Sequence, residues 1–292
     1  MRTRKRLRTE YYHPVTSGEW GIKGIDSDEP PEIDTSAAHS ARIYDYILGG
    51  KDNFEADRRA AEAAIARNPT MATGMRANRA VMRRMTAYLT AEAGVRQFLD
   101  IGTGLPTSPN MHEIAQRIAP ESRVVYVDND PIVLAHARAL LISAPEGACT
   151  YIDADARDPG RILADPKLSA TIDLSRPVAL MMFGIMHFLP DSDHPRTIVA
   201  RFLDALPSGS YLAIQHPTTD FYPPDVGSQS AYRGAGIPFQ YRGKDEFARF
   251  LDGLELVEPG ITPMAEWRPE LEPGPQPSPS EAGAYAALAR KP

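Results

Sequence analysis

The sequence predicts an α/β protein whose sheet is mostly parallel and doubly wound, with helices on both of its faces. Between residues 94 and 216, short apolar runs typical of buried strands alternate with segments of helical periodicity. The crossovers between these runs are short and helical, as parallel neighbours require. The apolar run Val-Ala-Leu-Met-Met-Phe over 178–183 predicts a central strand that is buried on both faces.

The first 33 residues do not share this pattern. They are rich in charged residues, Gly and Pro, and five of the first eight are Arg or Lys. Too few apolar side chains are present to offset the entropy of ordering, which predicts a disordered basic N-terminal arm over 1–33. The arm either makes a weak contact with a polyanion or has no role.

A helical N-terminal cap is expected over 34–93. Asp34 or Thr35 can cap its first helix, and the pair Gly49-Gly50 can end that helix. Helical spacing of the apolar residues predicts three helices. They are expected at 34–48, 54–67 and 70–93.

The rest of the chain, 94–292, is expected to form one core with a seven-stranded sheet. Strands are predicted at 95–101, 123–127, 148–153, 178–183, 211–215, 254–257 and 284–289. Helices are predicted at 106–119, 131–142, 159–165, 191–206 and 243–253. The Pro-rich stretch 269–280 is predicted to be a loop.

Composition limits the classes of function. No run of about 18 apolar residues could span a membrane, and the single cysteine, Cys149, favours a reducing, cytoplasmic location without a disulfide in the chain. A net charge of −6 argues against a nucleic-acid partner. His112, His136 and His194 lack a second ligand three or four residues later in the sequence, so no metal is expected.

A glycine-rich turn follows the first core strand. In Phe98-Leu-Asp-Ile-Gly-Thr-Gly-Leu-Pro, Gly102 and Gly104 let the backbone approach a ligand closely before the next helix begins. The dinucleotide fingerprint needs a third glycine near position 107, where this chain has Thr107. The turn therefore argues against a nicotinamide cofactor.

Carboxylates follow the next two strands. Asp128 ends the second strand, where an acidic side chain can accept both hydroxyls of a ribose. Asp155 ends the third strand and can accept a hydrogen bond from an exocyclic amine such as that of adenine. Because parallel strands end at one edge of the sheet, the glycine turn and the two acids are expected to lie together.

These strand ends resemble the S-adenosylmethionine (SAM) binding motifs of class I methyltransferases. The matching strings are Asp100-Ile-Gly-Thr-Gly, Val127-Asp128 and Asp153-Ala-Asp155. The resemblance implies a Rossmann-like sheet with SAM as cofactor. It further implies that the glycine turn contacts the methionine part, Asp128 the ribose and Asp155 the adenine.

Two longer strings resemble a bacterial family of SAM-dependent methyltransferases with largely undetermined substrates. They cover 40–57 and 98–107, within a similarity over about 34–290. The family resemblance implies that Arg42, Tyr44, Asp45 and the 49–54 turn lie against the cofactor, although a plain helix cap also explains this turn. The candidate cofactor-binding residues are Arg42, Tyr44, Asp45, Asp100, Gly102, Thr103, Gly104, Asp128, Asn129, Asp155, Ala156 and Phe183.

Two histidines are candidate catalytic residues. His187 follows the fourth strand and either acts as a base with a pKa near neutrality or packs below the cofactor. His216 ends the fifth strand, and the same two alternatives, a base or a packed histidine, apply to it. Tyr222 and Tyr232 could line an acceptor pocket.

The predicted activity is methyl transfer from SAM to an O, N or C nucleophile of a small molecule. The N-terminal helices and the loop over 217–242 are expected to close over this acceptor. A SAM-binding regulatory protein without catalysis is the first alternative, and a nicotinamide-dependent oxidoreductase is the second. A homo-oligomer is left open by the sequence.

Overall fold

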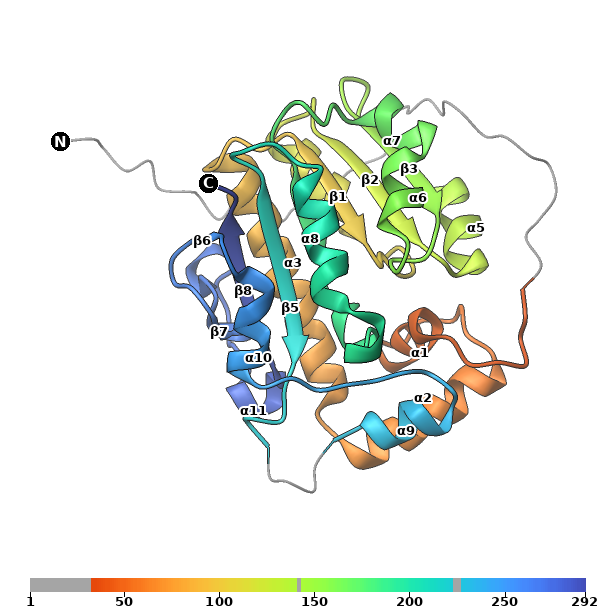
Figure 1. Ribbon diagram of the computed structural model, residues 1–292. Coiled ribbons are helices and arrows are strands. Elements are labelled where there is room, and N and C mark those ends of the chain that lie inside the picture. Colours follow the sequence, from red (N-terminus) through yellow and green to blue (C-terminus); the bar gives the residue numbers. More distant parts are fainter. Residues whose placement is uncertain (1–32, 141–142, 223–226) are drawn as a thin grey trace.

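The computed structural model describes residues 33–140, 143–222 and 227–292. The predicted disordered arm lies outside the described residues, except for its last position. The described chain forms an eight-stranded sheet with the order β3-β2-β1-β4-β5-β8-β6, and β7 pairs with β8 beside this path (Figure 1). The predicted α/β fold with a Rossmann-like sheet is therefore confirmed.

Five parallel strands build the sheet. They are β1 (Gln97–Ile101), β2 (Arg123–Asp128), β3 (Ala148–Asp153), β4 (Ala179–Met182) and β5 (Tyr211–Pro217). The antiparallel strand β8 (Ala284–Arg290) pairs with β5 and carries two-residue strands, β6 (Glu255–Leu256) and β7 (Thr262–Pro263). The eighth strand, β7, was not predicted from the sequence. The strand order reverses between β1 and β4, where a crevice opens at the carboxyl ends of the strands.

Three helices precede the first strand, and the others lie between strands. They are α1 (Ser40–Ile47), α2 (Glu55–Arg67), α3 (Met71–Ala91), α4 (Met111–Ile118), α5 (Pro131–Leu140), α6 (Pro159–Ala164), α7 (Pro166–Thr171), α8 (Pro195–Asp204), α9 (Gln229–Gly234), α10 (Lys244–Ala248) and α11 (Pro279–Ala282). Short 3-10 helices lie at Met186–Phe188, Asp191–Asp193, Arg249–Leu251, Met264–Glu266 and Pro269–Leu271. The predicted loop over 269–280 thus contains a 3-10 turn and the start of α11.

Three predicted helix boundaries are wrong. The first helix is capped by His39 rather than Asp34 or Thr35, because the Asp34 carboxylate instead accepts hydrogen bonds from Ser36. The helix predicted from residue 106 begins at Met111. Pro109 disfavours helical backbone at the preceding Ser108, so the helix starts only after this proline. The helix predicted over 191–206 is interrupted at His194, whose φ of 52° is left-handed.

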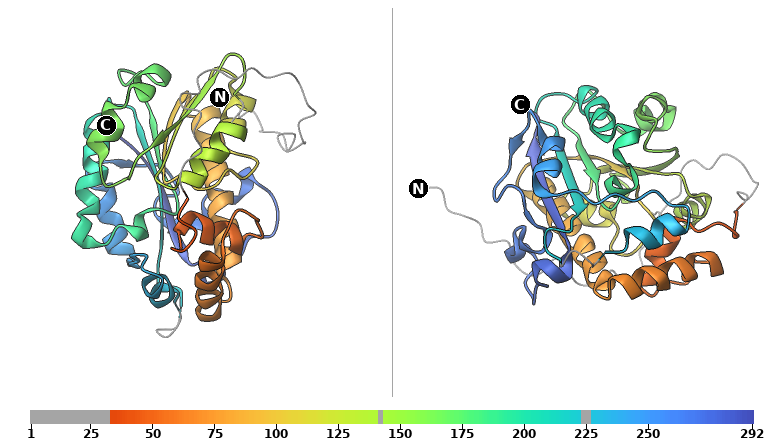
Figure 2. Two further views of the ribbon diagram at one scale, coloured as in Figure 1. Left: turned by 90° about the vertical axis from the view of Figure 1, so that its right-hand side faces the viewer. Right: turned by 60° about the horizontal axis from the view of Figure 1, so that its bottom comes forward.

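Alternate strand residues pack into two apolar cores on opposite faces of the sheet. Phe98 and Val124 lie in a core with α3, α4 and α5, whereas Leu99 and Val125 lie in a core with α6, α7, α8 and α10. Figure 2 shows α3 and α8 on opposite sides of the strands. The sheet is therefore doubly wound, as predicted. Among the described residues, no helix has the length and apolar character needed to cross a membrane.

A third apolar cluster lies beyond the carboxyl ends of the strands. It joins α1 and α2 to the distant segment around α9, and its members include Ile43, Ala61, Tyr232 and Phe239. Figure 1 shows α9 beside α2, away from the sheet. This arrangement places two parts of the chain, far apart in sequence, over the crevice between β1 and β4.

Arg84 joins α3 to the C-terminal part of the chain. Its guanidinium is fully buried and donates hydrogen bonds to the Met264 carbonyl at 2.8 Å and to Oε1 of Gln276 at 3.3 Å. We predict that Arg84→Met lowers the free energy of unfolding by about 1–3 kcal/mol, because a buried carbonyl loses its donor. Urea denaturation followed by circular dichroism measures this loss. Arg76→Met, at an exposed position of the same helix, is the control and should change stability by less than about 0.5 kcal/mol.

Candidate functional site

A cavity of about 650 Å³ lies at the carboxyl ends of the strands, a size typical of small-molecule sites. Its walls come from the strand ends, from α1 and α3, from the segments 183–189 and 228–241, and from Tyr222. All predicted site residues line it except Arg42 and His216. The predicted residues at its wall are Tyr44, Asp45, Asp100, Gly102, Thr103, Gly104, Asp128, Asn129, Asp155, Ala156, Phe183 and His187, together with Tyr222 and Tyr232.

The glycine turn after β1 forms one edge of the cavity. Gly102 and Gly104 have φ angles of 73° and 69°, which non-glycine residues rarely adopt. The Gly102 amide donates to the Val127 carbonyl at 2.8 Å, so the turn is tied to β2. A side-chain atom added at Gly104 would meet nothing within 4 Å. The backbone at Gly104 is therefore open to a ligand.

Asp128 lies directly beside this turn. Its Oδ2 accepts a hydrogen bond from the Gly104 amide at 2.7 Å, and its Oδ1 accepts one from the Asp130 amide at 3.0 Å. Burial raises the pKa of Asp128, although these two amide donors counteract the shift. Each carboxylate oxygen keeps a second lone pair, so the group can still accept two hydroxyls of a ligand.

Asp100 lies on the other side of the turn. Thr103 donates its hydroxyl to Oδ2 of Asp100 at 2.9 Å. Burial raises the pKa of Asp100 to about 7, despite the Thr103 hydrogen bond and the positive charge of Arg79, which also lines the cavity. A cation bound in the cavity would stabilise this carboxylate.

Asp155 is the third acid at this edge. Its Oδ1 accepts from the Arg157 amide at 2.8 Å, and its Oδ2 lies 3.1 Å from Nη1 of Arg157 and 3.2 Å from Nδ2 of Asn129. These donors fix the orientation of the carboxylate, and both Asn129 and Ala156 line the cavity beside it. The glycine turn and both predicted acids thus meet at one edge.

The N-terminal helices supply the opposite wall. The Tyr44 hydroxyl donates to the Met75 carbonyl at 2.9 Å. Asp45 accepts from the Asp52 amide and from Nδ2 of Asn53, both at 2.9 Å, and so shapes the 49–54 turn. Gly50 must be glycine here, because an added Cβ would lie 1.9 Å from the Asp45 carboxylate. The turn is both the cap of α1 and part of the cavity wall.

Arg42 does not reach the cavity wall. Its guanidinium is buried beneath α1, with Nε 3.3 Å from Oδ2 of Asp130 and 3.6 Å from Oδ1 of Asp57. Its terminal nitrogens donate to the carbonyls of Asp34 and Ala37, both at 3.0 Å. Arg42 therefore anchors the start of α1 to the core, instead of facing the cavity as the sequence suggested.

His39 is a cavity residue that the sequence did not reveal. Its Nδ1 lies 2.9 Å from Oδ2 of Asp130, and the ring lines the cavity near Asp128. Burial alone would lower the pKa of His39, but the hydrogen bond and charge of Asp130, helped by Asp128, outweigh it and raise the pKa. The ring therefore links the cap of α1 to the end of β2.

The two candidate catalytic histidines differ in their surroundings. His187 lines the cavity, and its ring packs on Phe188 and Phe239 with centroid separations of 4.0 and 4.7 Å. Burial, with the nearby His216 and Arg242, lowers the pKa of His187 well below its usual value. The expectation of a pKa near neutrality is therefore wrong, and this ring stays neutral in the folded protein.

His216 is fully buried away from the cavity wall. Its Nδ1 donates to the Pro217 carbonyl and its Nε2 accepts from Nη1 of Arg242, both at 2.8 Å. Burial lowers the pKa of His216 to about 3. Both ring nitrogens are therefore occupied, and the group cannot serve as a base for a molecule in the cavity.

Arg242, which the sequence analysis missed, holds the segment after β4 in place. Its guanidinium donates to the carbonyls of Met186 and Leu189 at 3.2 and 2.8 Å, and to Oδ1 of Asp191 at 2.7 Å. These contacts fix the backbone on both sides of His187. Nothing in the local sequence around Arg242 distinguishes it from a surface arginine.

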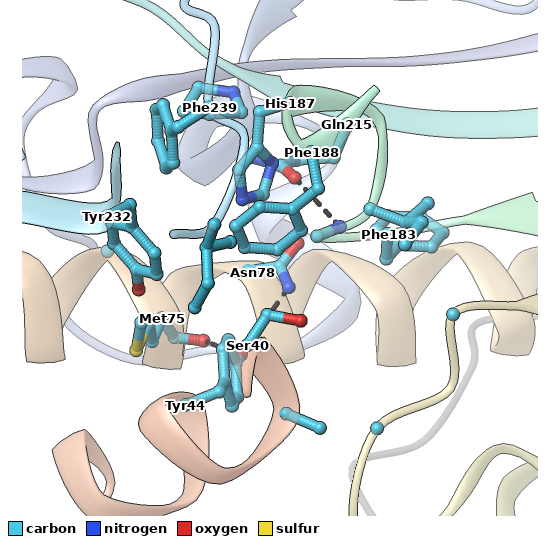
Figure 3. A pocket seen from close by; sticks show the side chains of 18 of the residues that line it. Ser40, Tyr44, Met75, Asn78, Phe183, His187, Phe188, Gln215, Tyr232 and Phe239 are labelled. Atoms are coloured by element: carbon cyan, nitrogen blue, oxygen red, sulfur yellow. Dashed lines mark hydrogen bonds between the residues drawn. The ribbon is translucent and has the colours of Figure 1, made fainter. Parts of the chain in front are cut away.

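The far half of the cavity is aromatic. Figure 3 shows Tyr232 and Phe239 facing His187 and Phe188, with Asn78 and Met75 of α3 below them. The ring centroids of Tyr232 and Phe239 lie 5.0 Å apart, and that of Phe188 lies 5.6 Å from Tyr232. In the part of the chain that the structure describes, no group of three His, Cys, Asp or Glu side chains could hold a metal ion.

The burial of Asp100 generates a prediction on the pH dependence of stability. A carboxyl whose pKa rises on folding supports the fold fully below pH 3.8 and loses that support as the pH rises to about 7. Asp100→Asn should therefore stabilise the protein, with a gain that grows by up to about 1.4 kcal/mol per pH unit and then levels off above pH 7. Urea denaturation at pH 5.5, 7 and 8.5 measures the gain.

The control for this prediction is Asp204→Asn, an exposed carboxyl on α8. It should change the free energy of unfolding equally at the three pH values. A gain for Asp100→Asn that is the same at pH 5.5 and 8.5 would show that burial does not raise the pKa of this carboxyl.

Comparisons with known proteins agree with this geometry. A family model described as S-adenosyl methyltransferase matches residues 26–292. A DUF574 family protein of known structure from Streptomyces avermitilis MA-4680 is 52% identical, with a TM-score of 0.85 over 89% of this chain and 100% of that chain. A candidate methyltransferase from Thermobifida fusca YX is 42% identical, with a TM-score of 0.81 over 90% of this chain and 98% of that chain. No curated protein matches the chain.

Proposed function

Because the chain belongs to the S-adenosyl methyltransferase family, its cofactor is SAM, and we propose that it transfers the SAM methyl group to a small molecule held in the aromatic half of the cavity. The predicted SAM dependence is confirmed, and the nicotinamide alternative is dropped. The observation that carries the proposal is the cavity itself, which continues from the strand ends to Tyr232 and Phe239.

The residues at the strand ends fit the parts of SAM. Asp128 keeps two free lone pairs for the ribose hydroxyls, and the open backbone at Gly104 leaves space for close approach. Asp100 is suited to the positively charged amino group of the methionine part, and Arg79 to its carboxylate. Asp155 and Ala156 would border the adenine. Bound SAM supplies an activated methyl group on a sulfonium sulfur.

The chain's own contribution is orientation and the exclusion of water. The aromatic rings of the far half and the N-terminal helices surround the space beside the strand ends. His187 faces this space as a neutral ring that can hydrogen-bond the acceptor, but its lowered pKa makes it a weak base. A non-catalytic SAM-binding protein would need no room for a second molecule, so the size of the cavity favours catalysis.

The proposal predicts that Asp128→Asn weakens SAM binding at least tenfold. The amide replaces one ribose acceptor by a donor, and the loss of a charged hydrogen bond costs about 1.5–3 kcal/mol. Calorimetric titration with SAM and with S-adenosylhomocysteine measures the dissociation constants. Asp153→Asn is the matched control, because Asp153 ends the neighbouring strand β3 but is exposed and outside the cavity wall.

Circular dichroism must show that both variants fold. Equal affinities of Asp128→Asn and the unchanged protein would remove Asp128 from the ribose site. Absence of SAM binding by the unchanged protein would contradict the proposed use of this cavity.

A further inference from the structure

Two carboxamides flank Gly184, which lies two residues beyond the end of β4 and lines the cavity. Gln215 of β5 is 4% exposed and accepts a hydrogen bond from the Gly184 amide through Oε1 at 3.1 Å. Asn78 of α3 is 8% exposed, and its Nδ2 would lie 3.4 Å from a Cβ added at Gly184. Both side chains line the cavity and are otherwise unused by the proposed cofactor site.

The orientation of the Asn78 amide follows from its neighbour. Tyr44 has one hydroxyl proton, which it donates to the Met75 carbonyl, so its oxygen can only accept from Asn78. This places Nδ2 of Asn78 toward Tyr44 at 3.4 Å and turns Oδ1 away. Among the described residues, Oδ1 has no hydrogen-bond partner although it is buried. Such an unpaired acceptor is costly unless a ligand supplies a donor.

The Gln215 amide is fixed in the same way. The Gly184 amide is a donor, so the atom it contacts must be the carbonyl oxygen of Gln215. Nε2 of Gln215 is left with two N–H groups, and no residue in the described parts of the chain accepts from them. The pair therefore offers one free acceptor, on Asn78, and one free donor, on Gln215.

The described wall residues on the acceptor side of this pair carry no formal charge, and the buried Arg242 behind His187 is already paired with Asp191. Among the described residues, the charged members of the cavity wall come from the cofactor half or from the N-terminal segment. The described wall residues between 183 and 284 are apolar, aromatic or neutral polar. His187, the one titratable ring there that could become a cation, stays neutral. Phe188, Tyr232 and Phe239 enclose the space (Figure 3). A charged ligand would lose its hydration here without gaining a counter-ion.

We propose that the acceptor half binds an uncharged aromatic molecule with a hydroxyl group, and that this hydroxyl donates to Asn78 and accepts from Gln215. This inference rests on the proposed methyl transfer and names the class of its acceptor. A hydroxyl is both a donor and an acceptor, so its chemistry matches the acceptor on Asn78 and the donor on Gln215, the two carboxamides that flank Gly184. A carboxylate lacks the donor that Asn78 needs, and an ammonium group lacks the acceptor that Gln215 needs.

Three naphthalene probes of similar size test the proposal, with S-adenosylhomocysteine present to fill the cofactor half. Fluorescence titration gives the dissociation constants of 2-naphthol, naphthalene and 2-naphthoate. Two neutral hydrogen bonds of about 0.5–1 kcal/mol each predict that 2-naphthol binds about 5- to 30-fold more tightly than naphthalene. The charged 2-naphthoate should bind more weakly than either. Equal affinities for the three probes, or a preference for 2-naphthoate, would overturn the proposal.

Two variants separate the contributions of the hydroxyl and of the ring. Asn78→Leu removes the acceptor and leaves one hydrogen bond, so the preference for 2-naphthol over naphthalene should fall to about two- to fivefold. Phe239→Leu removes ring contact, so it should weaken both probes while their ratio remains. A ratio unchanged in Asn78→Leu would overturn the assignment of Asn78. Thermal unfolding checks that each variant folds.

The titration with S-adenosylhomocysteine alone distinguishes a failure of the proposed function from a failure of the proposed acceptor class. If the unchanged protein does not bind it, the proposed function fails. If the unchanged protein and both variants bind S-adenosylhomocysteine with equal affinity, but the unchanged protein does not prefer 2-naphthol, only the assignment of the acceptor class fails.

Discussion

The buried charge of Asp130 is the constraint on which the site depends. Its carboxylate follows β2 and lies 2.9 Å from Nδ1 of His39 and 3.3 Å from Nε of the positively charged Arg42, both from the N-terminal segment. An uncompensated charge at this position would cost several kcal/mol, so the core and the N-terminal helices stabilise each other. The Asp130 amide also holds the Asp128 carboxylate, which in turn holds the Gly104 amide. One series of polar contacts thus joins the cap of α1 to the glycine turn.

The sequence predicted the fold where local pattern decides it. The apolar runs gave the five parallel strands and β8, because each strand of a doubly wound sheet is buried on both faces. The start of α1 could not be predicted, because Arg42 draws on the carbonyls of Asp34 and Ala37 and keeps that stretch out of the helix. The two residues of β7 form a strand only because β8 lies beside them, and α9 forms where it can pack on α2.

The same division applies to the site. Gly102, Gly104, Asp128 and Asp155 could be predicted because the ends of parallel strands always meet at one edge of a sheet. The remaining wall depends on contacts between distant segments. No local sequence pattern distinguishes Asn78 or Arg242. The role of Asn78 follows from its contacts with Tyr44 and Gly184, and Arg242 donates hydrogen bonds to the distant 186–191 segment. The assignment of His216 failed for this reason, since its tautomer is set by Arg242.

Aromatic walls of the proposed acceptor half belong to the third apolar cluster, which is separate from the two cores of the sheet. Tyr232 and Phe239 pack against α1 and α2 rather than against the sheet, whereas the proposed cofactor contacts of Gly104, Asp128 and Asp155 lie at the strand ends. Substitutions in this small core can reshape one half of the cavity while the other keeps its geometry. During divergence, related chains could therefore change the molecule they modify and retain the same cofactor. Identity at the strand ends alone is then a poor guide to a shared substrate.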